Sequence, residues 1–111
     1  MLFTLYIDDN AIPINVPDAL LHDAGDIFDK MDADMDKGWQ MGRTWVDNPD
    51  LEQRCQVAAE RIVTAYDTDN QKMGMMMAGY IMARAPLIRV ARVPTNGEIQ
   101  DIELLTSAEP F

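Results

Sequence analysis

Two short stretches near the start of the chain combine apolar, β-branched and aromatic residues. They are FTLYI, residues 3–7, and IPINV, residues 12–16, and the DDNA segment between them has the composition of a turn. This pattern predicts a β-hairpin. Pro13 has no N–H to donate, so we expect its strand to lie at the edge of a sheet.

A helical period follows the hairpin. From Asp23 to Val46, apolar residues recur every three or four positions, and most of the acids fall on the opposite side. The pattern predicts one continuous amphipathic helix over about 23–46, with Asp23 as its N-cap.

Two further helices are predicted by the signals at their ends. Asn48 and Pro49 suit the cap and the first position of a helix over about 49–66. A third helix follows over about 70–85, and Pro86 ends it because proline cannot continue a helix.

The chain then returns to the strand pattern. LIRVARV, residues 87–93, alternates apolar and basic residues, and residues 99–105 follow an Asn96-Gly97 pair, which is a strong hairpin signal. This second hairpin should place two arginines opposite two acids across its strands. These residues are Arg89, Arg92, Asp101 and Glu103.

Strands at both ends of the chain with helices between them are typical of an α+β fold. We therefore expect both hairpins to join in one antiparallel sheet that packs on the three helices. A chain of 111 residues is long enough for one modest core, so we expect a single globular domain over residues 1–111.

The formal net charge is −10, and nearly all of it lies in the first half of the chain. Residues 1–52 hold twelve acids and three bases, whereas residues 53–111 hold seven acids and six bases. Such a protein repels phosphate backbones and anionic lipids, so neither nucleic acid nor a membrane is an expected partner. A basic protein or a divalent cation fits this charge.

Candidate catalytic groups are few. Cys55 is the one cysteine, which fits a reducing compartment such as the bacterial cytoplasm, and its place on an apolar helix face predicts burial. His22 is the one histidine, which is too few for a multi-histidine metal centre. The sequence holds no phosphate-binding loop and no nucleophile motif, so we expect no catalytic residue and no cofactor.

An alternating acidic stretch suggests a metal site. Asp32, Asp34 and Asp36 match the first half of an EF-hand loop, but Gly38 comes one place late and Arg43 replaces the bidentate glutamate. On a helix, neighbouring acids of this stretch point about 160° apart, so the helix is the better interpretation. A divalent-cation site remains an alternative, with Asp29, Asp32, Asp34 and Asp36 as its ligands.

One acidic row on this helix has no basic partner nearby. Asp29, Asp32 and Asp36 lie three or four residues apart, and no base follows at that spacing until Arg43. Like charges at this spacing are destabilising. We expect the row either to be well solvated or to be neutralised by groups outside the helix.

The third predicted helix is rich in methionine and has no charged residue from Met73 to Ala83. Such a run is too short to cross a bilayer. A helix that is apolar all round must be covered all round, either as the central helix of the fold or in a two-fold dimer. We predict the dimer, because the other elements offer limited cover. The interface would contain Met75, Met76, Gly79 and Met82.

These observations predict a small, acidic, soluble bacterial protein of the cytoplasm without enzymatic activity. Its expected role is protein interaction, as a homodimer and with a basic protein partner. A divalent-cation-binding protein is the first alternative. The second is an accessory subunit, or an enzyme with a site between the sheet and the helices.

Overall fold

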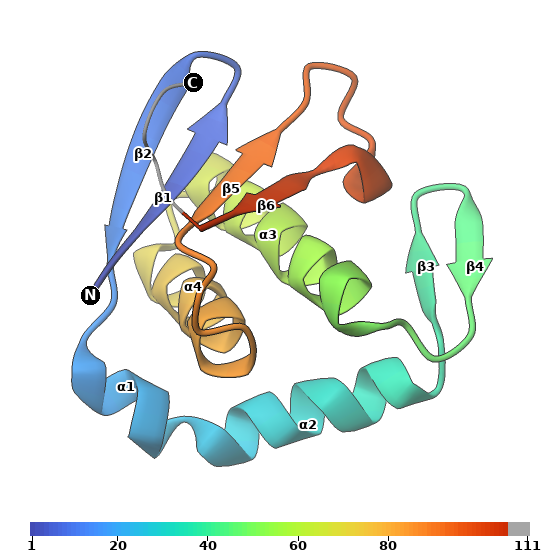
Figure 1. Cartoon of the computed structure of the whole chain (residues 1–111), viewed down its shortest axis with the longest axis horizontal. Coiled ribbons are helices and arrows are strands. Elements are labelled where there is room, and N and C mark those ends of the chain that lie inside the picture. Colours follow the sequence, from blue (N-terminus) through green and yellow to red (C-terminus); the bar gives the residue numbers. More distant parts are fainter. Residues whose placement is uncertain (107–111) are drawn as a thin grey trace.

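The structure, a computed structural model, describes residues 1–106 and has the predicted α+β fold (Figure 1). Helices α3 and α4 lie between the main sheet and the α1–α2 segment. The elements in chain order are β1 (Leu2–Ile7), β2 (Asn10–Asn15), α1 (Asp18–Asp23), α2 (Gly25–Asp36), β3 (Trp39–Met41), β4 (Thr44–Val46), α3 (Leu51–Asp67), α4 (Gln71–Arg84), β5 (Val90–Val93), the 3-10 helix η1 (Ile99–Asp101) and β6 (Glu103–Leu105).

The main sheet has the strand order β2-β1-β5-β6, so both predicted hairpins share one sheet. The expectation of a purely antiparallel sheet is wrong, because β1 and β5 pair in parallel. Each hairpin is antiparallel within itself. The helical segment between them returns the chain to the end of the sheet where β1 begins, and β5 therefore runs in the direction of β1.

Pro13 lies on an edge strand, as predicted, and its position explains why the sheet tolerates it. Met1 and Val16 exchange two backbone hydrogen bonds, both of 2.7 Å. Hydrogen-bonded and non-bonded pairs alternate along an antiparallel ladder, so the Thr4–Pro13 pair is a non-bonded one. The position where Pro13 lacks an N–H therefore faces the open edge of the sheet.

The predicted helix over 23–46 is wrong in its second half. Asp23, the predicted N-cap, is instead the last residue of α1. Helix α2 covers the first half of the range and ends at Asp36, after which β3 and β4 form a separate hairpin. Gly38 and Gly42 adopt φ values of +103° and +63°, which favour glycine and end the helical path. A Cβ at Gly38 would lie 2.3 Å from the ring of Trp45, so the hairpin folds back directly onto this glycine.

Helix α3 begins slightly later than predicted. Its N-cap is Asp50 and not Asn48, and Asn48 has a φ of +53°. Asp50 and Gln53 form a capping box, in which each side chain accepts a hydrogen bond from the other residue's backbone N–H, at 2.8 and 2.9 Å.

The second hairpin is only partly as predicted. Arg92 pairs with Glu103 across β5 and β6. Asp101 does not lie opposite Arg89, because residues 99–101 form η1 instead of strand, and its carboxylate accepts a hydrogen bond from Asn96.

Helix α4 is the central helix of the chain. Ala78, Tyr80 and Ile81 are fully buried, with α3, α1 and α2 packed around them together with the sheet. The Tyr80 ring meets the Phe28 ring of α2 edge to face, with 5.8 Å between centroids. A Cβ on Gly79 would lie 3.1 Å from Leu20 of α1. The fold therefore covers within one chain most of the apolar surface from which a dimer was predicted.

Candidate functional site

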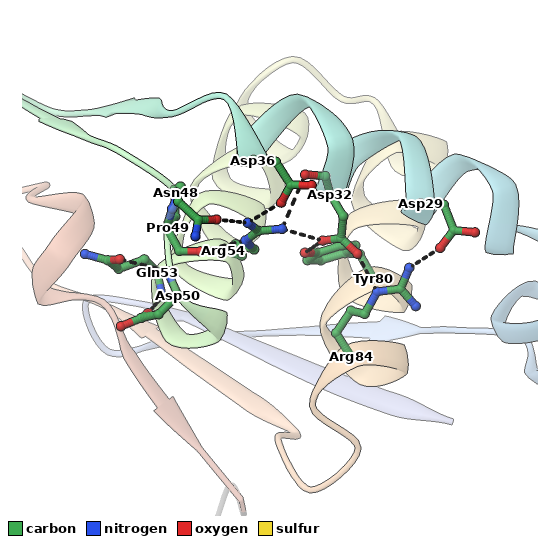
Figure 2. A network of polar contacts seen from close by, with 10 residues as sticks. All are labelled: Asp29, Asp32, Asp36, Asn48, Pro49, Asp50, Gln53, Arg54, Tyr80 and Arg84. Carbon is green, nitrogen blue, oxygen red and sulfur yellow. Dashed lines mark hydrogen bonds and ion pairs between the residues drawn. The ribbon is translucent and has the colours of Figure 1, made fainter.

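A network of charged side chains joins α2 to α3 and α4, with Asp32 at its centre (Figure 2). The Asp32 carboxylate accepts hydrogen bonds from the Tyr80 hydroxyl at 2.5 Å and from Nε of Arg84 at 2.8 Å. It also pairs with Nη1 of Arg54 at 3.4 Å. One carboxylate of α2 thus binds side chains from both of the helices beneath it.

The same two arginines neutralise the rest of the acidic row on α2. Nη2 of Arg84 reaches Asp29 at 2.8 Å, and Nη2 of Arg54 reaches Asp36 at 2.6 Å. The row therefore has partners outside its own helix, which is one of the two outcomes expected from the sequence.

Arg54 also fixes the loop before α3. Its Nε donates to the carbonyl oxygen of Pro49 at 2.7 Å, and its Nη2 donates to Oδ1 of Asn48 at 2.9 Å. The Arg54 side chain is only 13% exposed, so most of it is shielded from water. The start of α3 is thereby held against α2.

The electrostatics of the network suit a structural role. Burial raises the pKa of Asp32, but hydrogen bonds from Tyr80 and Arg84 lower it more, so the pKa lies below the usual value. Burial and the hydrogen bond to Asp32 raise the pKa of Tyr80. The carboxylate therefore stays ionised and the phenol stays protonated at neutral pH.

The four acids of the predicted cation site have different surroundings. Asp29, Asp32 and Asp36 lie in ion pairs with arginine, and Asp29, Asp34 and Asp36 are exposed. Within residues 1–106, no group of three or more His, Cys, Asp or Glu side chains is placed to hold a metal ion.

A groove of about 710 Å³ lies beside β6. Its walls are the first turn of α3, the connection from α4 to β5, and the segment from η1 to β6. Two leucines on its sides are strongly exposed, Leu51 at 51% and Leu87 at 77%. Further apolar side chains of the lining are Ile88, Ile102, Leu104 and Leu105.

The rim of this groove is acidic. Glu52, Asp101 and Glu103 belong to the lining and are exposed. Arg84 also belongs to the lining, but its guanidinium is paired with the carboxylates of α2. The groove thus combines an apolar lining with a rim on which Glu52 and Asp101 carry negative charge, whereas Glu103 lies opposite Arg92.

Cys55 lies in the lining of the groove and is buried, as predicted, with 1% exposure. Burial raises its pKa to about 12, so the thiol stays protonated and is a poor nucleophile at neutral pH. The neighbouring Gln56 donates to the carbonyl oxygens of Gln100 and Ile102, at 3.0 and 3.1 Å, which fixes η1 on α3. His22 is exposed on α1, outside the groove lining.

The four residues of the predicted interface do not form one surface. Gly79 and Met82 are buried inside the chain. Met75 and Met76 are half-buried and line different hollows, of about 430 Å³ beside β2 and about 330 Å³ beside α2.

The ion pairs of Arg54 and Arg84 with the acids of α2 form an arginine clamp. Sequence reasoning missed both this clamp and the groove. The unpartnered row on α2 left open that other groups neutralise it, but it could not identify Arg54 or Arg84. The groove has no local signal, because its walls come from residues 51–56, 84–88 and 100–105.

Within the described residues, no helix has both the length and the apolar character needed to cross a membrane. Comparisons of the chain with protein-family models, with curated proteins and with solved structures found no match.

Proposed function

We propose that this chain is a non-enzymatic protein-interaction module of the cytoplasm, and that the groove beside β6 is its binding surface. The observation that carries this proposal is the clustering of exposed apolar side chains, above all Leu51 and Leu87, around one concave surface. Single exposed apolar residues are common on proteins, whereas a group of them around one hollow is typical of a binding site.

The walls of the groove are held by specific contacts, which favours binding. The capping box and Arg54 fix the start of α3, Gln56 fixes η1, and the ion pairs of Arg84 fix the end of α4. A surface that is ordered before binding loses less conformational entropy when a partner arrives.

The described side chains around the groove favour binding over catalysis. The Cys55 thiol is protonated, and Arg84 is engaged by carboxylates. Nucleophilic or acid–base catalysis needs an activated group within reach of a proton partner. An accessory subunit, the related alternative, would use the same groove as its docking surface.

The cation-binding alternative has to compete with the arginines. A cation at Asp29, Asp32 and Asp36 would displace ion pairs of 2.6–3.4 Å that also order α3 and α4. Calorimetric titration with Ca²⁺ and with Mg²⁺ tests it. We expect no binding at micromolar protein, and micromolar affinity that is lost in a D32N/D36N variant would support the alternative.

Self-association is a second candidate, and one observation favours it. The hollow of about 330 Å³ beside α2 has four methionines in its lining and Ile27, which is 48% exposed. The methionines are Met31, Met73, Met76 and Met77, and the remaining lining residues are Arg61, Asn70 and Lys72. Methionine packs adaptably and is frequent at binding surfaces. A homodimer would use Met76 but not Met82, so a Met76→Asp variant should become monomeric and stay folded, as light scattering would show.

Peptide display on the folded protein tests the main proposal, with an L51K/L87K variant for counter-selection. Both leucines are more than half exposed, so the variant should fold normally. We expect enriched peptides that bind the protein and lose binding to the variant. An absence of enrichment, or equal binding to both proteins, would contradict the proposal.

A further inference from the structure

Building on the proposed function, we infer that the groove takes an extended segment of another protein, added as a strand along β6, in which apolar and basic residues alternate. Three observations lead to this partner: the direction of the backbone groups of β6, the apolar lining, and the charge of the rim.

The open side of β6 offers backbone groups at Leu104. Thr4 lies opposite Val90 in the parallel β1–β5 pair, and its N–H donates to the carbonyl oxygen of Arg89 at 3.0 Å. In a parallel pair a residue bonds to the neighbours of the residue opposite, so the backbone of Val90 points the other way, towards β6. Val90 lies opposite Leu105, and bonding direction alternates, so the N–H and C=O of Leu104 face outward.

β5, the neighbour of β6 within the sheet, shows which side chains β6 accepts opposite its own. Residues 89–93, RVARV, are apolar and basic, and Arg92 lies opposite Glu103. On the outer side, Glu52 and Asp101 add negative charge to the same rim. A second strand of similar composition would therefore find charge complementarity, in a chain whose net charge is −10.

The apolar residues of the added strand have a place in the groove. Successive side chains of a strand point to opposite sides, so every second residue would face the cavity between Leu51 and Leu87. The residues between them would face the rim and solvent, where basic side chains are favoured. Alternation of apolar and basic residues follows from this geometry.

A second copy of this chain is a poor occupant of the same edge. Pairing β6 with another β6 would bring two acidic rims together, each with Glu52, Asp101 and Glu103. Like charges that face each other across an interface repel, so they disfavour pairing with a second copy. The partner is therefore a different, basic protein segment.

Three labelled nine-residue peptides test the inference by fluorescence anisotropy. The first alternates Arg and Val, the second alternates Glu and Val, and the third is the Arg–Val peptide with N-methyl groups on alternate amides. We expect the first to bind, the second not to bind, and the third to bind about tenfold more weakly because it lacks the strand's N–H donors. Equal binding of the first and third peptides would overturn the added-strand geometry.

Two protein variants separate the groove from general attraction between opposite charges. L87K and D34N raise the net charge equally, but Leu87 lines the groove and Asp34 lies on α2. We expect L87K to weaken binding of the Arg–Val peptide about tenfold and D34N to change it less than about twofold. Equal effects of the two variants would overturn the inference.

A third variant, L104P, removes the outward N–H as Pro13 does on β2, and circular dichroism verifies its fold. Binding of the Arg–Val peptide should weaken by several-fold, and unchanged binding to the folded variant would contradict the inference. If displayed peptides depend on Leu51 and Leu87 but bind without alternation, the proposed function stands and this inference fails. If no displayed peptide depends on them, the proposed function itself fails.

Discussion

The two edges of the main sheet differ in what they offer to another strand. β2 has six residues, and its outward-facing Pro13 cannot donate a hydrogen bond. β6 has three residues, keeps an outward N–H at Leu104, and has a groove of about 710 Å³ beside it. Proline and short length are both ways to limit unwanted edge pairing. Pro13 therefore interrupts the edge of β2 between its outward amides at Ala11 and Asn15, whereas β6 relies on its shortness and leaves selection of a partner to the groove.

The same contrast extends to the helices beneath the two edges. At the β6 end, α3 and α4 are tied to α2 by Arg54 and Arg84. At the β2 end, the α3–α4 turn is held by Asn70, which caps α4 and donates its backbone N–H to Ala65 at 2.7 Å. Charged contacts over long sequence distances therefore order the end of the helix pair that carries the groove.

The largest expected effect comes from removing the centre of the clamp. The D32A variant removes the acceptor that Arg54, Arg84 and the Tyr80 hydroxyl share. This loss should lower the free energy of unfolding by about 2–4 kcal/mol. Urea unfolding followed by circular dichroism measures it. D34A is the matched control on the same helix, with an expected change within about 0.5 kcal/mol. Similar losses in both variants would show that the clamp adds no stability.

The clamp also predicts a pH dependence. The folded pKa of Asp32 is lowered, so its contribution to stability is complete above the unfolded pKa, near 4, and is lost as pH falls through the lower folded value. The difference in unfolding free energy between the protein and D32N should therefore shrink below about pH 4. Urea unfolding at several pH values measures it. A difference that stays constant would contradict this role of the carboxylate.

Tyr80 should contribute less than Asp32. Y80F removes the hydroxyl that donates to Asp32 but leaves both arginines in place, so we expect a loss of about 1 kcal/mol in unfolding free energy. The ring keeps its edge-to-face contact with Phe28. Thermal and urea unfolding provide the measurement. A loss as large as that of D32A would mean that the hydrogen bond from the Tyr80 hydroxyl, and not the pairing with the two arginines, carries the contribution of Asp32.

We expect the smallest change in stability from P13T, a variant that gives the β2 edge an additional outward N–H. The substitution also frees the unfolded chain slightly, so unfolding free energy should change by less than about 1 kcal/mol. The open edge then has the hollow of about 430 Å³ beside it, lined by Ile12, Ile14 and Met75. Calorimetry should show a second, weaker site for the Arg–Val peptide. One unchanged site would show that Pro13 is not what closes β2.

The sequence predicted those parts of the fold whose signals are local. The first hairpin follows from its alternation, Pro13 marks its edge, and Pro86 marks the end of α4. The second half of the predicted helix over 23–46 failed because its apolar spacing also fits two short strands. The positive φ values of Gly38 and Gly42 end the helix there and favour the hairpin.

The candidate site could not be predicted in the same way. Asp32 is separated by 22 residues from Arg54 and by 52 from Arg84, so no spacing rule connects them. The parallel pairing of β1 with β5, which sets the outward direction of Leu104, depends equally on the whole helical crossover. The unpartnered acidic row and the uncharged third helix were the two local features consistent with contacts from distant parts of the chain.

Amide hydrogen exchange with and without the Arg–Val peptide tests directly whether β6, and not β2, receives a partner strand. We expect slower exchange at the Leu104 amide when the peptide is bound. We expect no change at Ala11 and Asn15, the outward amides of β2 on either side of Pro13. Protection at Ala11 or Asn15, or an unchanged rate at Leu104 with the peptide bound, would contradict the addition of a strand at β6.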